Sequence, residues 1–298
     1  MRYSRQEIII GNSGQETLEK KTVAVVGVGA IGTVSSELLA RAGINLIVID
    51  RDVVELNNLQ RQLLYNEEDI GKPKALVAEK KLKKINSKIK IRSYCKDLSF
   101  ENINILKNAD LILDCTDNFE TRFLINDYCL KNKKPWIYAA GIRKNGTMMN
   151  FFPNNVCFRC IFKDARGLET CETAGVFGAT TTVVGSLQTI NAIKILLGKP
   201  VSREMVRIDV CENRFEKIKV KQRKNCAACN GVYEYLDGKK GSKAVKLCGR
   251  NTYQIKGAGQ KDFRVINDRV SVFKDGRALI KAKSEKEARS LYSKYVGN

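Results

Sequence analysis

The sequence predicts an α/β protein with a mostly parallel sheet, followed by a small α+β module. Three observations support this prediction: short β-branched runs alternate with helical stretches, polar residues cluster where those runs end, and a Gly- and Lys-rich stretch at residues 237–242 precedes a different pattern. Strands that alternate with helices favour a parallel sheet whose two faces are both covered. The 298 residues, 43% of them apolar, suffice for one large domain or two.

Four apolar runs are predicted to form strands of the sheet, at residues 22–26, 44–49, 109–113 and 136–140. The stretch between the first two contains Leu38, Leu39 and Ala40 and is predicted to be helical. Over residues 178–197, apolar positions recur at spacings of three or four, and a Gly-Lys-Pro sequence follows them. This pattern predicts a long, well-buried helix.

We predict two domains, residues 1–236 and residues 243–298, joined by a linker. The tail should contain strands at residues 264–266, 270–273 and 278–282, with a hairpin turn at Asp275-Gly276. A helix is predicted over residues 284–295, because Ser284 can cap it and Glu287 follows three residues later. The tail therefore has an α+β pattern of its own.

The chain is strongly basic. It contains 53 Lys and Arg against 32 Asp and Glu, a formal net charge of +21, of which residues 199–298 contribute +14. Such a charge favours acidic partners, whether an acidic protein, an anionic lipid or a nucleic acid. We do not expect nucleic acid to be the partner, because a Lys-rich solvated surface gives the same composition.

The sequence contains no histidine. This excludes a histidine general base, the Ser-His-Asp hydrolases and every metal site that needs imidazole, so a zinc site must consist of thiolates. Ten cysteines are too sparse for a disulfide scaffold, and no apolar run reaches the roughly 18 residues of a membrane span. The first residues also lack the apolar core of a secretion signal. We expect a cytoplasmic, reducing location without a membrane partner.

The segment Gly27-Val-Gly-Ala-Ile-Gly32 follows a predicted strand and opens a helix, and Asp50 ends the next strand. Glycines permit a tight turn close to phosphate oxygens, the helix N-terminus supplies N–H donors, and a carboxylate about twenty residues later binds ribose hydroxyls. The context predicts a Rossmann-like sheet with an adenine nucleotide site. Its nucleotide-binding residues are Gly27, Gly29, Ala30, Gly32 and Asp50. The motif does not distinguish NAD from ATP.

Charged residues follow at further strand ends: Arg61 in Asn57-Asn-Leu-Gln-Arg-Gln62, Lys74 in Gly71-Lys-Pro-Lys74, and Asp117 in Asp114-Cys-Thr-Asp-Asn118. A dehydrogenase does not need them, but nucleotidyl transfer does. Attack at an α-phosphate builds negative charge that Arg and Lys stabilise, while a carboxylate holds Mg²⁺. Taken alone, Arg61 and Lys74 would fit solvated surface charges better.

Six motifs in order resemble the ThiF/MoeB/HesA family, the prokaryotic relatives of ubiquitin-activating enzymes, over residues 1–235. They are Arg2-Tyr-Ser-Arg-Gln6, the glycine loop, Asn58-Leu-Gln-Arg61, Gly71-Lys-Pro-Lys74, Asp114-Cys-Thr-Asp-Asn118 and the paired Cys-x-x-Cys segments. The resemblance implies ATP-dependent adenylation of the C-terminal glycine of a small ubiquitin-fold sulfur-carrier protein, with release of pyrophosphate. Thiamine synthesis, molybdopterin synthesis and tRNA thiolation are the processes it implies.

The resemblance also implies roles for single residues. Asp50 is expected to hold the ribose and Asp117 to bind Mg²⁺. The expected triphosphate contacts are Asn58, Arg61 and Lys74, and Asn118 belongs to the same nucleotide-binding set as Asp117. This chain departs from the family at Ala30, where many members have another glycine. We expect little effect, because the other loop glycines remain.

Arg5 is implied to act on a second subunit. In the family, the residue at its position reaches the neighbouring subunit's nucleotide site, so a homodimer is expected. A sulfur-donor protein is a further expected partner.

Cys157-Phe-Arg-Cys160 and Cys226-Ala-Ala-Cys229 are separated by 65 residues. Two such pairs fit a four-thiolate zinc site with no open position, which is structural. The separation exceeds that of compact zinc ribbons, and disulfides are the alternative, disfavoured by a reducing compartment. The resemblance supports zinc. We expect it to clamp the segment after the long helix, in the C-terminal half, onto the chain before that helix.

Cys171 lies where family members carry a cysteine that forms an acyl-disulfide or thioester with the carrier. Glu169 and Glu172 should raise the pKa of its thiol, whereas Arg166 should lower it, so a covalent role and an inert thiol both stay open. The other cysteines are expected to be small core residues: Cys95, Cys115, Cys129, Cys211 and Cys248.

Three other functions are alternatives to adenylation of a sulfur carrier. An enzyme that activates a ubiquitin-like protein for conjugation would require a thioester at Cys171. An NAD-dependent oxidoreductase would leave Arg61, Lys74 and Asp117 without a purpose. A nucleic-acid-binding module would explain the charge but not the nucleotide motif. For the basic tail, we expect recruitment of an acidic carrier or sulfur-donor protein through electrostatic steering.

Overall fold

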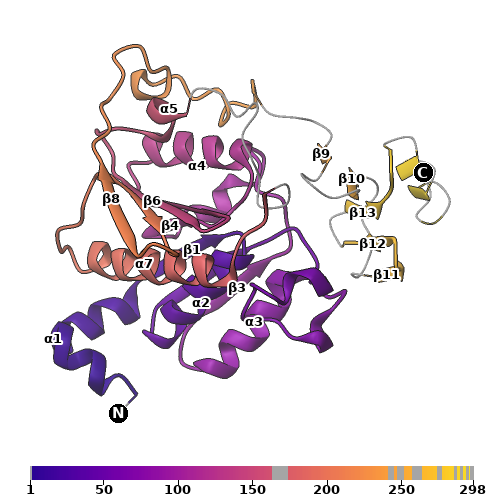
Figure 1. The fold of residues 1–298 in the computed structure, drawn as a ribbon, viewed down its shortest axis with the longest axis horizontal. Coiled ribbons are helices and arrows are strands. Elements are labelled where there is room, and N and C mark those ends of the chain that lie inside the picture. Colours follow the sequence, from indigo (N-terminus) through magenta and orange to yellow (C-terminus); the bar gives the residue numbers. More distant parts are fainter. Residues whose placement is uncertain are drawn as a thin grey trace. The chain divides into compact units, whose positions relative to one another are not determined.

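The computed structural model describes residues 2–162 and 174–240. In the tail it describes residues 245–246, 252–256, 264–273, 277–284, 287–288, 291–292 and 295. The chain divides into two compact units, Met1–Lys239 and Lys240–Asn298 (Figure 1).

An eight-stranded sheet forms the centre of the first unit, in the order β3-β2-β1-β4-β5-β6-β7-β8. The first five strands in this order are parallel, and the last three pairs are antiparallel. The strands are β1 (Thr22–Val26), β2 (Asn45–Ile49), β3 (Ile91–Tyr94), β4 (Leu111–Asp114), β5 (Trp136–Ile142), β6 (Asn145–Phe151), β7 (Met205–Asp209) and β8 (Arg214–Ile218). The predicted α/β class with a mostly parallel, Rossmann-like sheet is thus confirmed.

The helices are α1 (Ser4–Lys20), α2 (Ala30–Arg41), α3 (Lys74–Ile85), α4 (Phe119–Lys131), α5 (Phe158–Ile161) and α7 (Gly178–Leu196). Short 3₁₀ turns are η1 (Leu56–Asn58), η2 (Glu67–Asp69), η3 (Ile103–Leu106) and η4 (Ala228–Asn230). Helices cover both faces of the sheet, with α2 and α7 on one side and α4 on the other (Figure 1).

Alternate residues of each strand enter different cores. In β1, Val23 and Val25 join the core shared with α2, α3 and α7, whereas Ala24 and Val26 join the core shared with α4 and the segments around Cys157 and Cys226. Because side chains of a strand alternate between faces, a strand covered on both sides reads as continuously apolar. This is why the sequence pattern located the central strands.

The long helix α7 ends one residue before the predicted boundary, and α1 was not predicted. Gly11, with φ of +75°, kinks α1, and most of that helix is exposed, so it has no strong apolar period. None of the described helices combines the length and the apolar character needed to cross a membrane.

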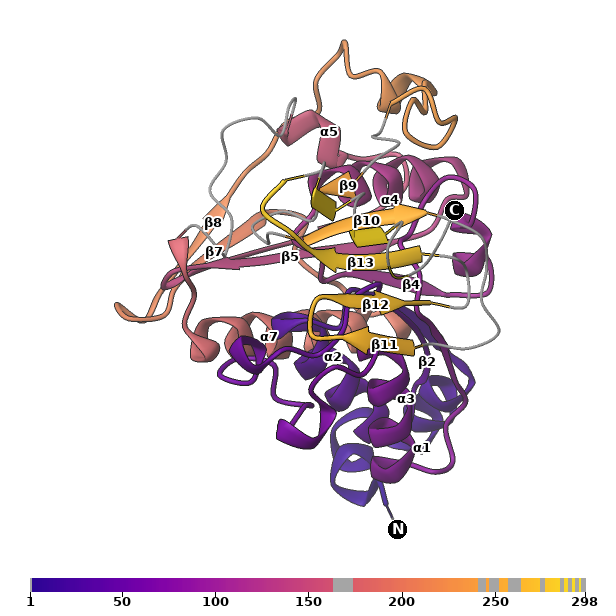
Figure 2. The same cartoon turned by 90° about the vertical axis from the view of Figure 1, so that its right-hand side faces the viewer.

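The second unit is a five-stranded antiparallel sheet in the order β11-β12-β13-β10-β9 (Figure 2). Its strands are β9 (Val245–Lys246), β10 (Thr252–Lys256), β11 (Arg264–Asn267), β12 (Val270–Val272) and β13 (Arg277–Lys281). β11, β12 and β13 match the predicted strands, whereas β9 and β10 were not predicted. The predicted turn at Asp275-Gly276 lies outside the described residues, and residues 287–288, 291–292 and 295, within the predicted helix, are helical.

Candidate active site and cysteine cluster

The glycine loop joins β1 to α2, and its glycines have different surroundings. A Cβ on Gly27, whose φ is +86°, would lie 2.8 Å from the carbonyl oxygen of Cys115, and a Cβ on Gly32 would lie 1.9 Å from that of Gly27. These two glycines therefore permit backbone packing. A Cβ on Gly29 would meet only Gln62 Nε2, at 3.8 Å. Gly29 caps α2 and Ala30 begins it, so the open space lies beside free helix N–H groups.

Asp50 directly follows β2 and is 9% exposed. Its Oδ2 accepts the N–H of Val28 in the glycine loop at 2.7 Å, and its Oδ1 accepts the N–H of Asp52 at 2.8 Å. Burial raises the pKa of Asp50, and the charge of Lys74 opposes this shift. The carboxyl group thus lies against the glycine loop.

Lys74 is the first residue of α3 and is only 2% exposed. Its Nζ lies 3.7 Å from Asp52 Oδ2. The hydroxyl of Tyr65 lies between the glycine loop and α3, donating to the carbonyl of Val28 at 2.8 Å and lying 3.4 Å from that of Lys74. The interpretation of Lys74 as a solvated surface charge is therefore wrong: it is a buried cation beside the glycine loop.

The segment after β2 brings two more polar residues toward this edge. Asn58 in η1 is 1% exposed, and its Oδ1 accepts the N–H of Glu55 at 3.3 Å. Arg61 is half-buried, and its Nη1 donates to the carbonyl of Asn57 at 2.7 Å. Neither contact uses more than part of the side chain's hydrogen-bonding capacity.

Sequence reasoning did not single out Gln62, although it stands in the segment quoted for Arg61. Gln62 is 3% exposed, and its Oε1 is buried without a hydrogen-bond partner among the described residues. Among the described residues outside the loop and helix of Gly29, its Nε2 is the one atom within 4 Å of a Cβ built on Gly29. A buried amide oxygen without a partner beside the glycine loop is a group that a hydroxyl or N–H of a ligand would satisfy.

Arg51 is a second residue that sequence reasoning missed. Its Nη1 lies 3.1 Å from Asp97 Oδ1, after β3. Burial acts to lower the pKa of Arg51, but the charges of Asp97, Asp52 and Asp117 together raise it. Asp117 is exposed, in the segment after β4. Asp52 follows β2, Asp97 follows β3 and Asp117 follows β4, and all three carboxylates act on the Arg51 guanidinium. Arg51 therefore lies at the carboxyl edge of the parallel strands.

Asn118 is the N-cap of α4, where its Oδ1 accepts the N–H of Glu120 at 2.9 Å. Asp114, in the same motif, is fully buried and pairs with Arg122, Nε to Oδ2, at 3.2 Å. Asn118 and Asp114 thus shape the start of α4, while Asp117 between them remains accessible.

Arg5 lies away from these residues. The start of α1 is held by Asn86 Nδ2, which donates to the hydroxyl of Tyr3 at 2.9 Å, and by Gln6 Nε2, which donates to the carbonyl of Ala42 at 3.2 Å. Asn86 and Ala42 precede β3 and β2, so they mark the amino edge of the parallel strands. Arg5 is exposed there. The structure does not bring it to the nucleotide-binding residues of its own chain.

The two Cys-x-x-Cys pairs come together in one cluster: Cys157, Cys160, Cys226 and Cys229. Sulfur–sulfur distances are 3.8 Å for Cys157–Cys160, 3.6 Å for Cys157–Cys226, 3.5 Å for Cys160–Cys229 and 3.3 Å for Cys157–Cys229. Sulfurs 2.3 Å from a tetrahedral zinc lie about 3.8 Å apart. Burial raises the pKa of the Cys229 thiol to about 11 and that of Cys157 as well. A cation that replaces these protons fits the cluster.

The cluster is tied to α4 through Arg159. This residue pairs with Asp127 on α4, Nη1 to Oδ1, at 3.7 Å, and with Glu234 after the second cysteine pair. Its guanidinium also lies 5.6 Å from the ring centre of Tyr235. The segment 226–236, which follows α7 in the chain, is thereby fastened to residues that precede α7.

The remaining cysteines differ. Cys115 and Cys129 are buried and Cys95 is half-buried, but Cys211 is exposed. Its assignment to the core is wrong, because it lies in the turn between β7 and β8. Cys171, its neighbours Arg166, Glu169 and Glu172, and Cys248 lie outside the described residues.

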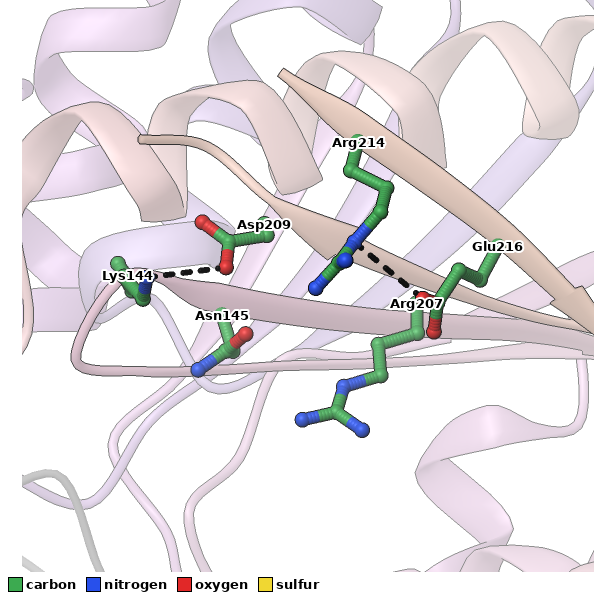
Figure 3. A pocket seen from close by; sticks show the side chains of 6 residues that line it. All are labelled: Lys144, Asn145, Arg207, Asp209, Arg214 and Glu216. Carbon is green, nitrogen blue, oxygen red and sulfur yellow. Dashed lines mark ion pairs between the residues drawn. The ribbon is translucent and has the colours of Figure 1, made fainter. Parts of the chain in front are cut away.

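A charged cleft of about 150 Å³ opens on β6, β7 and β8 (Figure 3). Lys144 pairs with Asp209 at 3.1 Å and Arg214 with Glu216 at 3.3 Å, and the side chain of Asn145 completes the lining. The guanidinium of Arg207 points away from both pairs, and Arg207 forms no ion pair with any described residue (Figure 3). The cleft can thus accept one further carboxylate.

Comparisons with known proteins give consistent matches. The sequence model of the ThiF family matches residues 3–229. The Bacillus subtilis (strain 168) sulfur carrier protein ThiS adenylyltransferase is 34% identical over 334 residues, covering 99% of this chain and 99% of that protein. The Thermus thermophilus sulfur carrier protein adenylyltransferase is 38% identical, covering 76% of this chain and 90% of that protein.

Solved structures of Escherichia coli MccB share the fold. The structure with MccA has a TM-score of 0.70 and 25% identity, covering 77% of this chain and 74% of that chain. The structure with ATP has a TM-score of 0.68 and 25% identity, covering 77% and 73%.

Proposed function

Because this chain belongs to the ThiF family, we propose that it is an ATP-dependent adenylyltransferase acting on a small ubiquitin-fold sulfur-carrier protein. The carrier's C-terminal glycine carboxylate attacks the α-phosphorus of ATP. The bond from that phosphorus to the bridging oxygen breaks, and pyrophosphate leaves as the acyl-adenylate forms. Two relatives are named as adenylyltransferases of sulfur carrier proteins, which supports this substrate class.

The main support within the molecule is the meeting of four sequence motifs at one sheet edge. The glycine loop, Asp50 and Lys74 come from separate segments, yet hydrogen bonds and burial hold them together. Asn58 is buried, and its carbonyl accepts the N–H of Gln62, whose Nε2 lies 3.8 Å from a Cβ built on Gly29. Among the described residues, the one ion pair of the buried Lys74 ammonium is the 3.7 Å contact to Asp52, and its charge also acts on Asp50. A triphosphate bound beside the glycine loop would add negative charge next to this buried cation.

We assign the substrate contacts accordingly. The N–H groups at the start of α2, with Gly27, Gly29, Ala30 and Gly32, take the phosphates. The ribose lies on Asp50, and Asn58, Arg61 and Lys74 bind the triphosphate. Mg²⁺ is held by Asp117, with Asn118 shaping the loop. Mg²⁺ neutralises the leaving pyrophosphate in such reactions.

A homodimer with Arg5 acting in trans is part of the proposal. Arg5 lies at the amino edge of its own sheet, so it can serve a nucleotide only in another subunit. On the same helix, Ile8 is 76% exposed and Ile9 is 79% exposed. Two large apolar side chains in sequence on an exposed helix favour burial against a second copy.

The four-cysteine cluster is proposed to bind one structural Zn²⁺, which locks the segment after α7 onto α4. All four positions of a tetrahedral ion would be filled by sulfur, leaving none for substrate. Thiolates persist in the reduced cytoplasm, where we place the protein.

The carrier's body is proposed to rest on the charged cleft at β6–β8, with an acidic side chain paired to Arg207. Asn145 pairs with Ile142, the last residue of β5, and Asp209 pairs with both Asn145 and Arg214, so the cleft lies at the sheet edge where the parallel strands end. The basic charge of the chain favours an acidic carrier.

The test is ATP–pyrophosphate exchange in the presence of Mg²⁺ and candidate carrier proteins, with mass spectrometry for the acyl-adenylate. We expect Arg61→Ala and Lys74→Ala to reduce exchange at least a hundredfold while the fold is retained. Lys72→Ala is the matched control, because Lys72 is exposed two residues from Lys74. Normal exchange in both site variants would refute the assignment. A stable thioester on Cys171 would instead identify the alternative, a conjugation-starting enzyme.

A further inference from the structure

Gln188 is a fully buried amide in the middle of α7. Its Oε1 accepts a hydrogen bond from Ser35 Oγ at 2.7 Å and one from the Cys115 thiol at 3.2 Å. Its Nε2 donates to the carbonyl of Asp114 at 3.1 Å and to that of Ile137 at 3.3 Å. Every hydrogen-bonding position of the amide is therefore used.

These partners belong to the elements that surround the proposed nucleotide. Ser35 lies on α2, a turn beyond the glycine loop, and Cys115 belongs to the segment that carries Asp117. The carbonyl of Ile137 is on β5. α7 approaches α2 closely, because a Cβ on Gly185 would lie 2.9 Å from Val34 Cβ. Gln188 thus joins α2, β4 and β5 at a single point.

Cys115 transmits this contact to the glycine loop. Its carbonyl oxygen lies 2.8 Å from a Cβ built on Gly27, and its own Cβ lies 3.2 Å from one built on Gly32. Cys115 therefore packs closely against both Gly27 and Gly32, and it lies two residues before Asp117. A displaced Cys115 would move the glycine loop and Asp117 relative to each other.

An amide matches all four partners, because two are carbonyls that accept from its Nε2 and two are groups that donate to its Oε1. Ser35 Oγ also lies 3.3 Å from the carbonyl of Gly185. Glutamate would set an oxygen against the carbonyls of Asp114 and Ile137, and an apolar side chain would remove the acceptor of the Cys115 thiol and the donor to both carbonyls. The amide at position 188 therefore holds Ser35, Cys115 and the carbonyls of β4 and β5 in fixed positions relative to one another.

From these contacts we infer that Gln188 is a positioning residue for adenylation. Through Ser35 and Cys115 it sets the distance between the N-terminus of α2, where the phosphates bind, and Asp117, where Mg²⁺ binds. This inference rests on the proposed function for the identity of the ligands. The chemistry remains with the residues that touch ATP, and Gln188 acts through them.

The experiment compares Gln188→Met with Thr189→Val. Thr189 is also buried in α7, but its Oγ1 donates to the carbonyl of Gly185 in the same helix, at 2.8 Å, and to no other described residue. Both variants should lower the melting temperature. Below it, Gln188→Met should lower kcat/KM for ATP in the exchange assay about tenfold or more, whereas Thr189→Val should leave it unchanged. Equal values for Gln188→Met and the wild type, or an equal loss in both variants, would overturn the inference.

A second pair of variants decides the question if Gln188→Met does not fold. Cys115→Ser keeps a donor toward Gln188 and should retain most of the activity that Cys115→Ala loses. Equal activity of the Ser and Ala variants would contradict the coupling. Calorimetric affinity for a non-hydrolysable ATP analogue gives a readout independent of turnover. If the wild type binds the analogue but adenylates no carrier, the proposed function fails, while the affinities of the Gln188 and Cys115 variants still test their role.

Discussion

At the scale of single residues, two glycines three positions apart serve different purposes. Gly32 lies where α2 touches the glycine loop, and the added Cβ would be 1.9 Å from a backbone oxygen that cannot move aside. A Cβ on Gly29 would meet the end of Gln62, at 3.8 Å, and no other side chain in the part of the chain that the structure describes. A packing glycine protects the fold, whereas a glycine beside open space admits a ligand.

We predict that Gly32→Ala destabilises the protein by at least about 3 kcal/mol, because the backbone must shift. Gly29→Ala should change the free energy of unfolding by less than about 0.5 kcal/mol. It should nevertheless weaken ATP binding about tenfold, because the methyl group occupies the phosphate approach. Urea denaturation and calorimetric titration with ATP measure both quantities. Normal ATP affinity in folded Gly29→Ala would place the phosphates elsewhere.

The burial of Lys74 could not be predicted from the sequence. Its type and spacing fit a surface lysine, and only its place at the start of α3, next to Asp52 and the glycine loop, makes it a buried cation. Gln62 and Arg51 were missed for the same reason. Their importance comes from burial and from neighbours on other strands, which no local pattern contains.

At the scale of elements, the sequence predicted those parts of the fold that are buried on both sides. The sequence predicted the strands β1, β2 and β4 and the helix α7, because these elements pack against apolar residues in the two cores. β7 and β8 were not predicted, since exposed charged residues such as Arg207 and Arg214 interrupt their apolar pattern. The cysteine spacing predicted a shared site, and the structure brings the four sulfurs together across 65 intervening residues.

The cysteine cluster gives a prediction for the segment 226–236. Removing Zn²⁺ with a strong chelator should lower the melting temperature, because the ion joins two cysteine pairs that are far apart in the chain. The aromatic residues beneath α5 should then become exposed. Elemental analysis should find one zinc per chain before treatment.

Cys226→Ser should reproduce the destabilisation seen after chelation, and the control is Cys211→Ser, since Cys211 is exposed and away from the cluster in sequence. A protein that is fully folded without metal, with an unchanged melting temperature, would refute a structural zinc.

At the scale of the whole molecule, a trans role for Arg5 can be tested by mixing two inactive variants. Arg5→Ala and Lys74→Ala each spoil both sites of their own homodimer. In a mixed dimer, the site of the Lys74→Ala subunit lacks both Lys74 and the partner's Arg5 side chain. The site of the Arg5→Ala subunit has its own Lys74 and a native Arg5 from the partner, so it is intact. If half of the dimers are mixed, about a quarter of the wild-type exchange rate should return.

The mixture should be prepared by unfolding and refolding together, or by co-expression with two affinity tags. No recovery of exchange in purified mixed dimers would assign Arg5 to its own subunit, and a monomeric wild type would remove the basis of the proposal.

The C-terminal residues, Lys240–Asn298, form a compact unit of their own. Residues 243–298 hold 14 Lys and Arg against 5 Asp and Glu, and the Thermus thermophilus relative matches this chain over only 76% of its length. Adenylation should therefore not depend on this unit. We predict that deleting residues 243–298 leaves pyrophosphate exchange at saturating carrier unchanged but raises the KM for the carrier severalfold at low salt. The difference should shrink as salt is added, because charge steering is screened. A KM that is unaffected at every salt concentration would assign the basic unit to another partner.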